Sequence, residues 1–293
     1  MRRIALLALI WGWSFLFIKV AVEGMPPSTV AGARIALGAV VMAIVLRARS
    51  IDLPRDRRVW GHLAVQGIVG SAIPFTLLAW GEQHVSSALT AVLNASTPMF
   101  AAAFAAVVLH ERLRVTQHAG LVLGFVGVGV AAGLGASDLA SSSLGGSAAA
   151  VGAAACYGLS FAYARRNLSR VPPLVAATGQ LIAASVFVGP FAVTAAAREG
   201  VHLEPHRLLA IVVLGAVGTG FAYLLNYQSI AAVGPTRASI VTQLVPVVAV
   251  TVGVVFLDED FHLRLLVGGG LTLVGIALLH ERIRRFRPVP ASV

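Results

Sequence analysis

The chain has 293 residues, of which 58% are hydrophobic and only 12% are charged, and its mean hydropathy is +0.87. Soluble domains are about 45–50% apolar and about 25% charged, so this composition excludes an ordinary soluble protein. The net charge of +10 would suggest nucleic-acid binding in a soluble protein, but here the basic residues stand in short blocks between apolar runs. That arrangement is typical of membrane topology signals, so we expect no nucleic-acid partner.

Apolar segments follow one another along the whole chain, each close to the roughly 20 residues that a helix needs to cross a bilayer. Residues 135–146 form a Gly/Ser-rich polar stretch, which is typical of a flexible linker. It divides a first half, 1–134, from a second half, 147–281, and a basic tail, 282–293, follows. We predict an all-α integral membrane protein with ten transmembrane helices, at residues 4–22, 28–46, 60–80, 86–108, 116–134, 147–164, 172–194, 206–228, 237–256 and 263–280.

Lys and Arg residues are distributed unevenly between the two ends of these spans. With the N-terminus placed inside, 17 of the 22 fall in inner segments and 3 in outer segments, while Lys19 and Arg34 lie within spans. Cytoplasmic loops are enriched in Lys and Arg, so both termini are predicted to be cytoplasmic. An odd number of spans would break this alternation.

The two halves carry the same pattern of residues. A shift of 146 takes the stretch SFLFIKVAVEGMPP, which begins at Ser14, onto SFAYARRNLSRVPP, which begins at Ser160. Further along, a shift of 148 takes Gly70 onto Gly218, Pro98 onto Pro246, and Glu111 onto Glu259. Because each half has five spans, the second must enter the membrane in the opposite orientation. Inverted repeats of this kind are typical of secondary transporters.

The most specific matching stretches lie late in each half. The first half contains VSSALTAVLNASTPMFAAAFAAVVLHERL followed by GLVLGFVGVGVA, and the second contains VGPTRASIVTQLVPVVAVTVGVVFLDE followed by GGGLTLVGIAL. With the opening WGWSFLFIK and the stretch AGARIALGAV, they resemble the EamA domains of the drug/metabolite transporter superfamily over nearly the whole chain. The resemblance implies an exporter or facilitator with a central path between the halves, and several bacterial members export amino acids and related metabolites.

We therefore expect an exporter of small metabolites, amino acids first, in a bacterial inner membrane. Its partners would be the substrate and membrane lipid, and it would be a monomer or a homodimer. A multidrug, cation or nucleoside efflux carrier is the alternative, and a cation carrier would need an acidic residue within the path. A membrane enzyme is the third hypothesis.

Two prolines mark the best candidate site, because each removes an N–H from the middle of a span. Pro98 would leave the carbonyl of Asn94 without a partner, and Pro246 would do the same for Thr242. Broken helices at equivalent places in both halves point to a binding site near the middle of the membrane. The polar residues around the prolines are Thr90, Asn94 and Thr97 in the fourth span, and Ser239, Thr242 and Gln243 in the ninth. The alternative is that small polar residues only hold helices together.

Arg34 lies about two turns inside the second span, where an arginine must face protein or water and find acceptors. It would bind a substrate carboxylate through its bidentate fork, or serve structurally by capping carbonyls or pairing with Glu23 or Glu82. Its counterpart in the second half is the neutral Gln180. Lys19 is nearer a span end, where it would either lift its ammonium to the interface beside Glu23 or place a charge in an outer vestibule.

Aromatic residues are expected to wall the path. Trp13, Tyr157 and Tyr223 are the best candidates, with Asn226 one turn beyond Tyr223, and such walls suit amphipathic solutes such as larger amino acids. Glycines of the fifth and tenth spans are expected to allow close helix packing within each half, and a dimer face is the alternative. They are Gly120, Gly124, Gly127, Gly268 and Gly275.

Catalytic patterns are missing, so we expect no enzymatic activity, no cofactor and no metal site. His110-Glu111 lacks the second histidine of an H-E-x-x-H motif, and no phosphate-binding loop or serine elbow is present. Acidic residues occur only at span ends, as Glu82 does. Because proton relays use buried carboxylates or histidines, we expect facilitated transport or weak coupling, and the substitution Glu82→Gln is expected to leave transport largely intact.

Overall fold

The computed structural model describes residues 2–111, 113–133, 141–233, 241–260 and 262–280, and the regular structure in these ranges is helical throughout. Within them, seven helices are long and apolar enough to cross a membrane, and three shorter apolar helices accompany them. The chain is therefore an all-helical membrane protein. Residues 135–140 of the expected linker and the whole expected tail, 282–293, lie outside the described residues.

The first half runs from the N-terminus to residue 131. Its helices are α1 (Arg2–Val22), α2 (Pro27–Ala48), α3 (Arg57–Gly67), the π-helical segment η1 (Ile68–Ala72), α4 (Ile73–Glu82), α5 (Ser87–Asn94), α6 (Thr97–Val108) and α7 (Val115–Ala131). The segments α3, η1 and α4 form one continuous helical rod.

In the described residues the second half has a matching series of elements. They are α8 (Ser141–Asn167), α9 (Pro173–Glu199), α10 (Pro205–Val212), the π-helical segment η2 (Val213–Phe221), α11 (Ala222–Val233), α13 (Val241–Phe256) and α14 (Leu263–His280). The exception is that α13 is continuous where the first half is divided into α5 and α6. The sequence had led us to expect a flexible linker over residues 135–146. Helix α8 begins at Ser141, so residues 141–146 are helical instead.

Local chemistry explains where several helices begin. Helices α2 and α9 each start with a proline, at Pro27 and Pro173, whose missing N–H costs nothing in the first turn. The hydroxyl of Ser86 accepts a hydrogen bond from the Leu89 N–H at 3.1 Å and so caps α5.

The predicted break in the fourth span is present, but its counterpart in the ninth span is not. The helix stops at Asn94 and restarts at Thr97 as α6, whereas α13 continues through Pro246. Thr97 donates its hydroxyl to the Asn94 carbonyl at 2.8 Å and so replaces the N–H that Pro98 lacks. The expectation of a broken helix at Pro246 was therefore wrong, because a proline inside a helix removes one hydrogen bond without having to end it.

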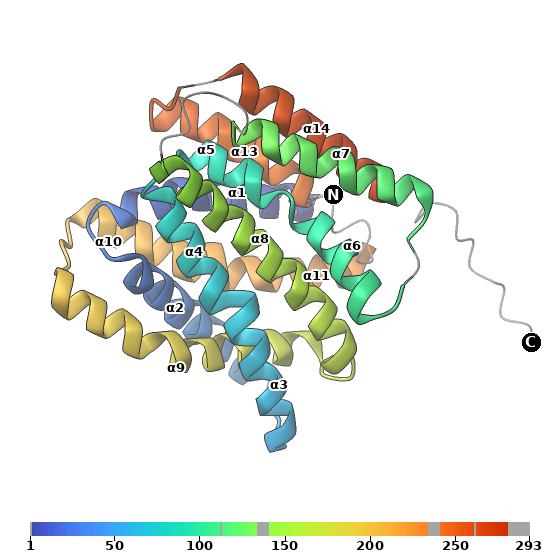
Figure 1. Cartoon of the computed structure of the whole chain (residues 1–293). Helices are drawn as coiled ribbons and strands as arrows, with labels where there is room; N and C mark the ends of the chain where they lie inside the picture. The colour runs from blue at the N-terminus through green and yellow to red at the C-terminus, as the bar shows by residue number, and fades with distance from the viewer. Residues whose placement is uncertain (1, 112, 134–140, 234–240, 261, 281–293) are drawn as a thin grey trace, which may run out of the picture.

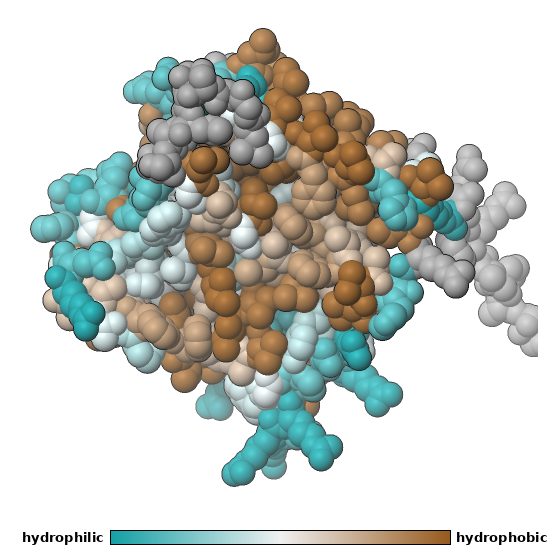
Figure 2. All heavy atoms as spheres, viewed as in Figure 1, coloured by the Kyte–Doolittle hydropathy of each residue, from teal (hydrophilic) through white to brown (hydrophobic). Residues whose placement is uncertain are grey.

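The helices of the two halves interleave (Figure 1). Helix α7 packs along α14 at one edge of the molecule and α2 along α9 at the opposite edge. Helix α1 packs on α13, and α8 packs on α4, α5 and α6. Figure 2 shows hydrophobic side chains over the middle of the visible face and hydrophilic ones at the helix ends, including the beginning of α3. Large apolar side chains such as Val186, 75% exposed, lie on the outside, as a lipid-facing surface requires.

The glycines of α7 and α14 have a different role from the one expected. These residues lie where α7 and α14 cross, and therefore join the halves rather than packing each half internally. A Cβ on Gly275 would stand 2.6 Å from the Gly120 carbonyl oxygen, and one on Gly127 would stand 2.6 Å from that of Gly268. Only glycine lets the two backbones approach so closely.

Candidate functional site

Arg34 of α2 is the most deeply placed cation in the described part of the chain, with 6% of its surface exposed. Its Nε donates to the Thr219 hydroxyl of η2 at 2.8 Å. Its guanidinium carbon lies 3.9 Å from the centroid of the Phe75 ring, which is a cation–π contact. Its two terminal nitrogens donate no hydrogen bond to any described residue, so the fork keeps free donors at a depth where a charge needs acceptors.

Gln180 of α9 stands at the position equivalent to Arg34 and makes an equivalent contact. Its Nε2 donates to the Ser71 hydroxyl of η1 at 3.1 Å. The hydroxyl of Tyr223, from α11, is within hydrogen-bonding reach of both of these side chains. Arg34 and Gln180 are 146 residues apart and Ser71 and Thr219 are 148 apart, so the two hydrogen bonds link matching positions of the two halves.

Aromatic rings close the space around these polar groups. The Phe75 ring meets the Tyr157 ring of α8 edge-on, with centroids 6.3 Å apart. We call the whole group the central cluster, and its members are Arg34, Ser71, Phe75, Tyr157, Gln180, Thr219 and Tyr223. It combines a cationic fork, an amide, hydroxyls and rings, which is a set that can bind a small amphipathic solute.

The two π-helical segments bring the hydroxyls of the central cluster into place. Thr219 lies within the wide turns of the π-helical segment η2, and its hydroxyl donates to the Leu214 carbonyl at 3.1 Å. Such turns occur frequently at functional sites because they redirect a side chain. Gly215 lets η2 approach α2, since a Cβ there would stand 2.5 Å from the Cβ of Leu37. Gly67 serves α3 and α9 in the same way, because a Cβ there would overlap the Gln180 carbonyl.

The fourth and ninth spans do not supply hydroxyls to the central cluster. Thr90 donates to the Ser86 carbonyl at 3.0 Å and Thr97 to that of Asn94, so both hydroxyls are used within their own helices. The Asn94 Oδ1 is buried without a hydrogen-bond partner. Helix α5 does pack on α13, where Thr242 and Gln243 are half-buried. The two helices are therefore neighbours, while Ser239 lies outside the described residues.

Comparison with known proteins identifies the fold and its class. The model of the EamA-like transporter family matches residues 3–132 and 144–280. The chain belongs to this family. An uncharacterised transporter of Archaeoglobus fulgidus is 26% identical over 280 residues, which cover 94% of this chain and 96% of the relative. A probable terminal-alkyne amino-acid exporter of Streptantibioticus cattleyicolor is 28% identical over 273 residues, covering 93% and 90% of the two chains.

The fold is also known from a crystal structure. It superposes with a TM-score of 0.68 at 20% sequence identity and covers 97% of this chain and 98% of its own. The family and the names of its relatives indicate a transporter rather than an enzyme.

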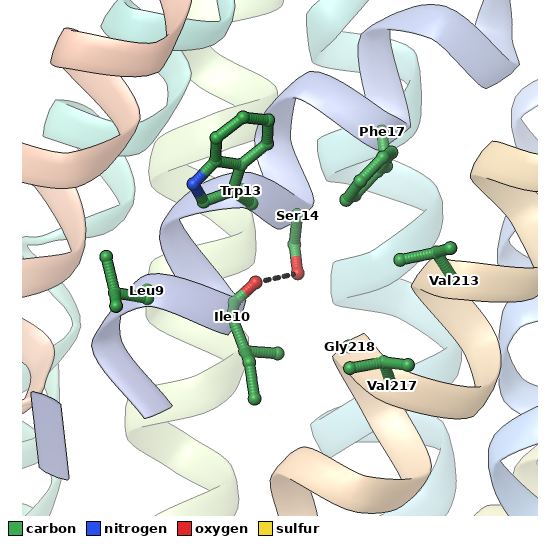
Figure 3. A pocket seen from close by; sticks show the side chains of 8 residues that line it. All are labelled: Leu9, Ile10, Trp13, Ser14, Phe17, Val213, Val217 and Gly218. Carbon is green, nitrogen blue, oxygen red and sulfur yellow. Dashed lines mark hydrogen bonds between the residues drawn. The ribbon is translucent and has the colours of Figure 1, made fainter. Parts of the chain in front are cut away.

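Trp13 of this EamA-like transporter lies apart from the central cluster and lines an apolar pocket of about 260 Å³ between α1 and η2 (Figure 3). Its ring lies 4.9 Å from that of Phe256. A second apolar pocket, of about 240 Å³, lies between α5, α13 and α14 and is lined in part by Pro246. Of the remaining expected site residues, Pro98 and Asn226 are half-buried.

One of the two sequence hypotheses placed the Lys19 ammonium beside Glu23, but the structure shows other partners for it. Its Nζ donates to the backbone carbonyls of Glu82 at 2.5 Å and Val85 at 3.2 Å, and so caps the end of α4. Its counterpart Arg165 forms an exposed ion pair of 2.5 Å with Glu111.

Sequence reasoning gave Arg34, Gln180, Tyr157 and Tyr223 of the central cluster but missed Ser71, Thr219 and Phe75. A signal for the two hydroxyls was present, because each directly follows one glycine of the matched pair Gly70 and Gly218. Phe75 stands 148 residues before Tyr223 and so is its counterpart.

Proposed function

We propose that this protein is a secondary transporter that exports small metabolites, amino acids first, by alternating access around the central cluster. The observation that carries the proposal is the buried Arg34 fork, whose terminal nitrogens have no acceptor among the described residues. A substrate carboxylate supplies two acceptors in the geometry that a guanidinium prefers. The membrane is a bacterial inner membrane, with both termini cytoplasmic.

Structural detail supports an inverted repeat of two five-helix units, 1–134 and 147–281, in which the three shorter helices also cross the bilayer. His110 and Asp258, 148 residues apart, both have left-handed backbone conformations, with φ of 56° and 50°. The N–H groups of Glu111 and Glu259 bond to the carbonyls of Ala105 and Gly253, at 3.4 and 3.2 Å.

The central cluster is suited to alternating access because its hydrogen bonds join one half to the other. Arg34 bonds from α2 to η2, and Gln180 bonds from α9 to η1. A rocking motion between the halves would separate these pairs and expose their donors and acceptors to the substrate. Contacts at the two ends of the molecule, Arg165 with Glu111 and Glu259 with the start of α5, would open in turn.

Larger amino acids fit the chemistry of the central cluster best. Phe75, Tyr157 and Tyr223 offer ring surface beside the cationic fork, so a carboxylate and an apolar side chain can be bound together. The relative from Streptantibioticus cattleyicolor, named as a probable amino-acid exporter, supports the same class of substrate.

The test is transport of labelled amino acids by the purified protein in proteoliposomes, with empty liposomes as the background. Aromatic and large aliphatic amino acids should be transported and should compete with one another. Amines that lack the carboxylate, such as phenethylamine in place of phenylalanine, should not compete.

Competition by phenethylamine as strong as that by phenylalanine would show that Arg34 does not select the carboxylate. Transport of an organic cation dye or a nucleoside, with no amino acid moved, would refute amino-acid export and favour the alternative efflux carrier.

A further inference from the structure

Glu82, the last residue of α4, is a fully buried acidic side chain. It is 0% exposed, and neither of its carboxyl oxygens has a hydrogen-bond partner among the described residues. Buried polar groups are nearly always hydrogen-bonded, because burying them unpaired is unfavourable and burying a bare charge is far more so. The described residues therefore leave both carboxyl oxygens of Glu82 able to take a ligand.

Several donors near Glu82 are already in use. Lys19 gives its ammonium to the backbone carbonyls of Glu82 and Val85 rather than to the carboxyl group. On the other side of the α4–α5 turn, residues 83–86, the Glu259 carboxylate accepts the N–H groups of Ser87 at 2.6 Å and Ala88 at 2.9 Å. These contacts hold the turn against α1 and the α13–α14 loop and enclose Glu82.

The charged and titratable groups around Glu82 act on it only at longer range. Helix α5 and η1, which also pack on α4, carry no titratable side chain. The other neighbours contribute five titratable groups: Lys19 from α1, Arg34 from α2, Tyr157 from α8, Glu259 from the α13–α14 loop, and His84 from the turn itself. The His84 ring packs on the Trp80 ring. Lys19 and Arg34 attract a negative charge at Glu82 while Glu259 repels it, and no ion pair joins Glu82 to either cation.

We propose that Glu82 is a proton-binding site whose protonation accompanies closure of the α4–α5 end of the molecule. As that end closes, a proton from water forms an O–H bond at the carboxylate, and the neutral acid is enclosed. When the end opens, water reaches the group and the proton returns to it. This differs from the expectation of facilitated transport or weak coupling, in which Glu82→Gln leaves transport largely intact.

The sign of the pH effect follows from linkage. The closed form binds one proton more than the open form, so rising pH favours opening, by at most about tenfold in the equilibrium constant per pH unit. Only the consequence for transport rests on the proposed function. With both termini cytoplasmic, as predicted, the α4–α5 end of the molecule lies outside. Release of substrate to the outside would then become easier as external pH rises.

The experiment measures closure and the proton separately, in protein reconstituted in lipid. Ser87→Cys in a Cys156→Ala background places a thiol at a position that is 1% exposed and next to Glu259, so a maleimide reaches it only when the end opens. At each pH, the labelling rate of the protein with Glu82 is divided by the rate of the protein with Glu82→Gln. The titration of the thiol itself affects both rates and cancels in this ratio. Glu23→Gln is the matched control, because Glu23 is an exposed glutamate that follows α1 at the same end.

With Glu82 present, labelling should increase with pH more steeply than with Glu82→Gln, and Glu23→Gln should behave like the parent. Infrared spectra should contain the carbonyl band of a protonated carboxyl group, absent with Glu82→Gln and kept with Glu23→Gln. A labelling ratio that does not change with pH, or a wild-type spectrum without the band, would overturn the proposal. Neither readout requires transport, so a protein that fails to move amino acids but passes both tests refutes only the proposed function.

Discussion

Replacing Arg34 by Lys tests the proposed binding role most directly. The change keeps a positive charge at the position but removes the planar fork. Lysine cannot reproduce the 2.8 Å bond from Nε to Thr219 together with two further donors aimed at a substrate, because its single ammonium is a point charge. The substrate carboxylate should therefore lose one of its two charge-assisted hydrogen bonds.

One charge-assisted hydrogen bond contributes about 1.5–3 kcal/mol. At about 1.4 kcal/mol per tenfold change, KM for phenylalanine should rise roughly 10- to 150-fold in Arg34→Lys. Initial rates of uptake into proteoliposomes over a range of phenylalanine concentrations measure this. Arg165→Lys is the matched control, since its ion pair with Glu111 is exposed, with 64% of the Arg165 side chain accessible, and such pairs contribute little.

A structural role for Arg34 gives a different result. Loss of the contacts with Thr219 and Phe75 alone would lower the yield and the thermal stability of the protein, or the maximal rate, and leave KM close to that of the wild type. A folded Arg34→Lys protein whose KM stays within about threefold of wild type would refute carboxylate binding by this residue.

The remaining predictions concern packing and the fourth and ninth spans. Gly275→Ala should lower the free energy of unfolding by about 1–3 kcal/mol, because the new methyl group forces α7 and α14 apart. Gly270→Ala is the control and should be neutral or stabilising, because no atom lies within 4 Å of the new Cβ. Equal melting temperatures of the two variants in detergent would contradict this prediction. Thr97→Val should cost about 1–3 kcal/mol by leaving the Asn94 carbonyl unpaired, and Thr97→Ser should not, so similar thermal midpoints for the two would be evidence against the hydroxyl's role. Asn94→Ala and Gln243→Ala should lower transport without lowering expression, and wild-type transport by both would exclude a substrate site between α5 and α13.

Much of the fold could be predicted because its signals are local. A run of about 20 apolar residues has few alternatives to a helix in lipid, so the helix positions follow from composition along the chain. Comparison of the chain with itself also reveals the matched glycines and the doubled prolines that end at Pro27 and at Pro173. The same comparison supplied Gln180 as the counterpart of Arg34.

Contacts between segments far apart in the chain could not be predicted in this way. Pro98 and Pro246 give the same local signal, yet only the first accompanies a break, because neighbouring helices decide how a proline is accommodated. Glu82 stands at a helix end, where solvation is the usual outcome, yet it is fully buried where α1 and the α13–α14 loop hold the α4–α5 turn.

The sequence by itself determined the membrane-embedded helices, the repeated pattern and the presence of an arginine deep in a span. Only the tertiary structure decided that Arg34 meets Thr219, 185 residues away, and that Gln180 meets Ser71. The physical reason is that helical periodicity specifies which residues share a face, whereas the partner of that face depends on how all the helices pack together. The π-helical turns at η1 and η2 sharpen this dependence, since they redirect Ser71 and Thr219 away from the face that a regular helix would give them.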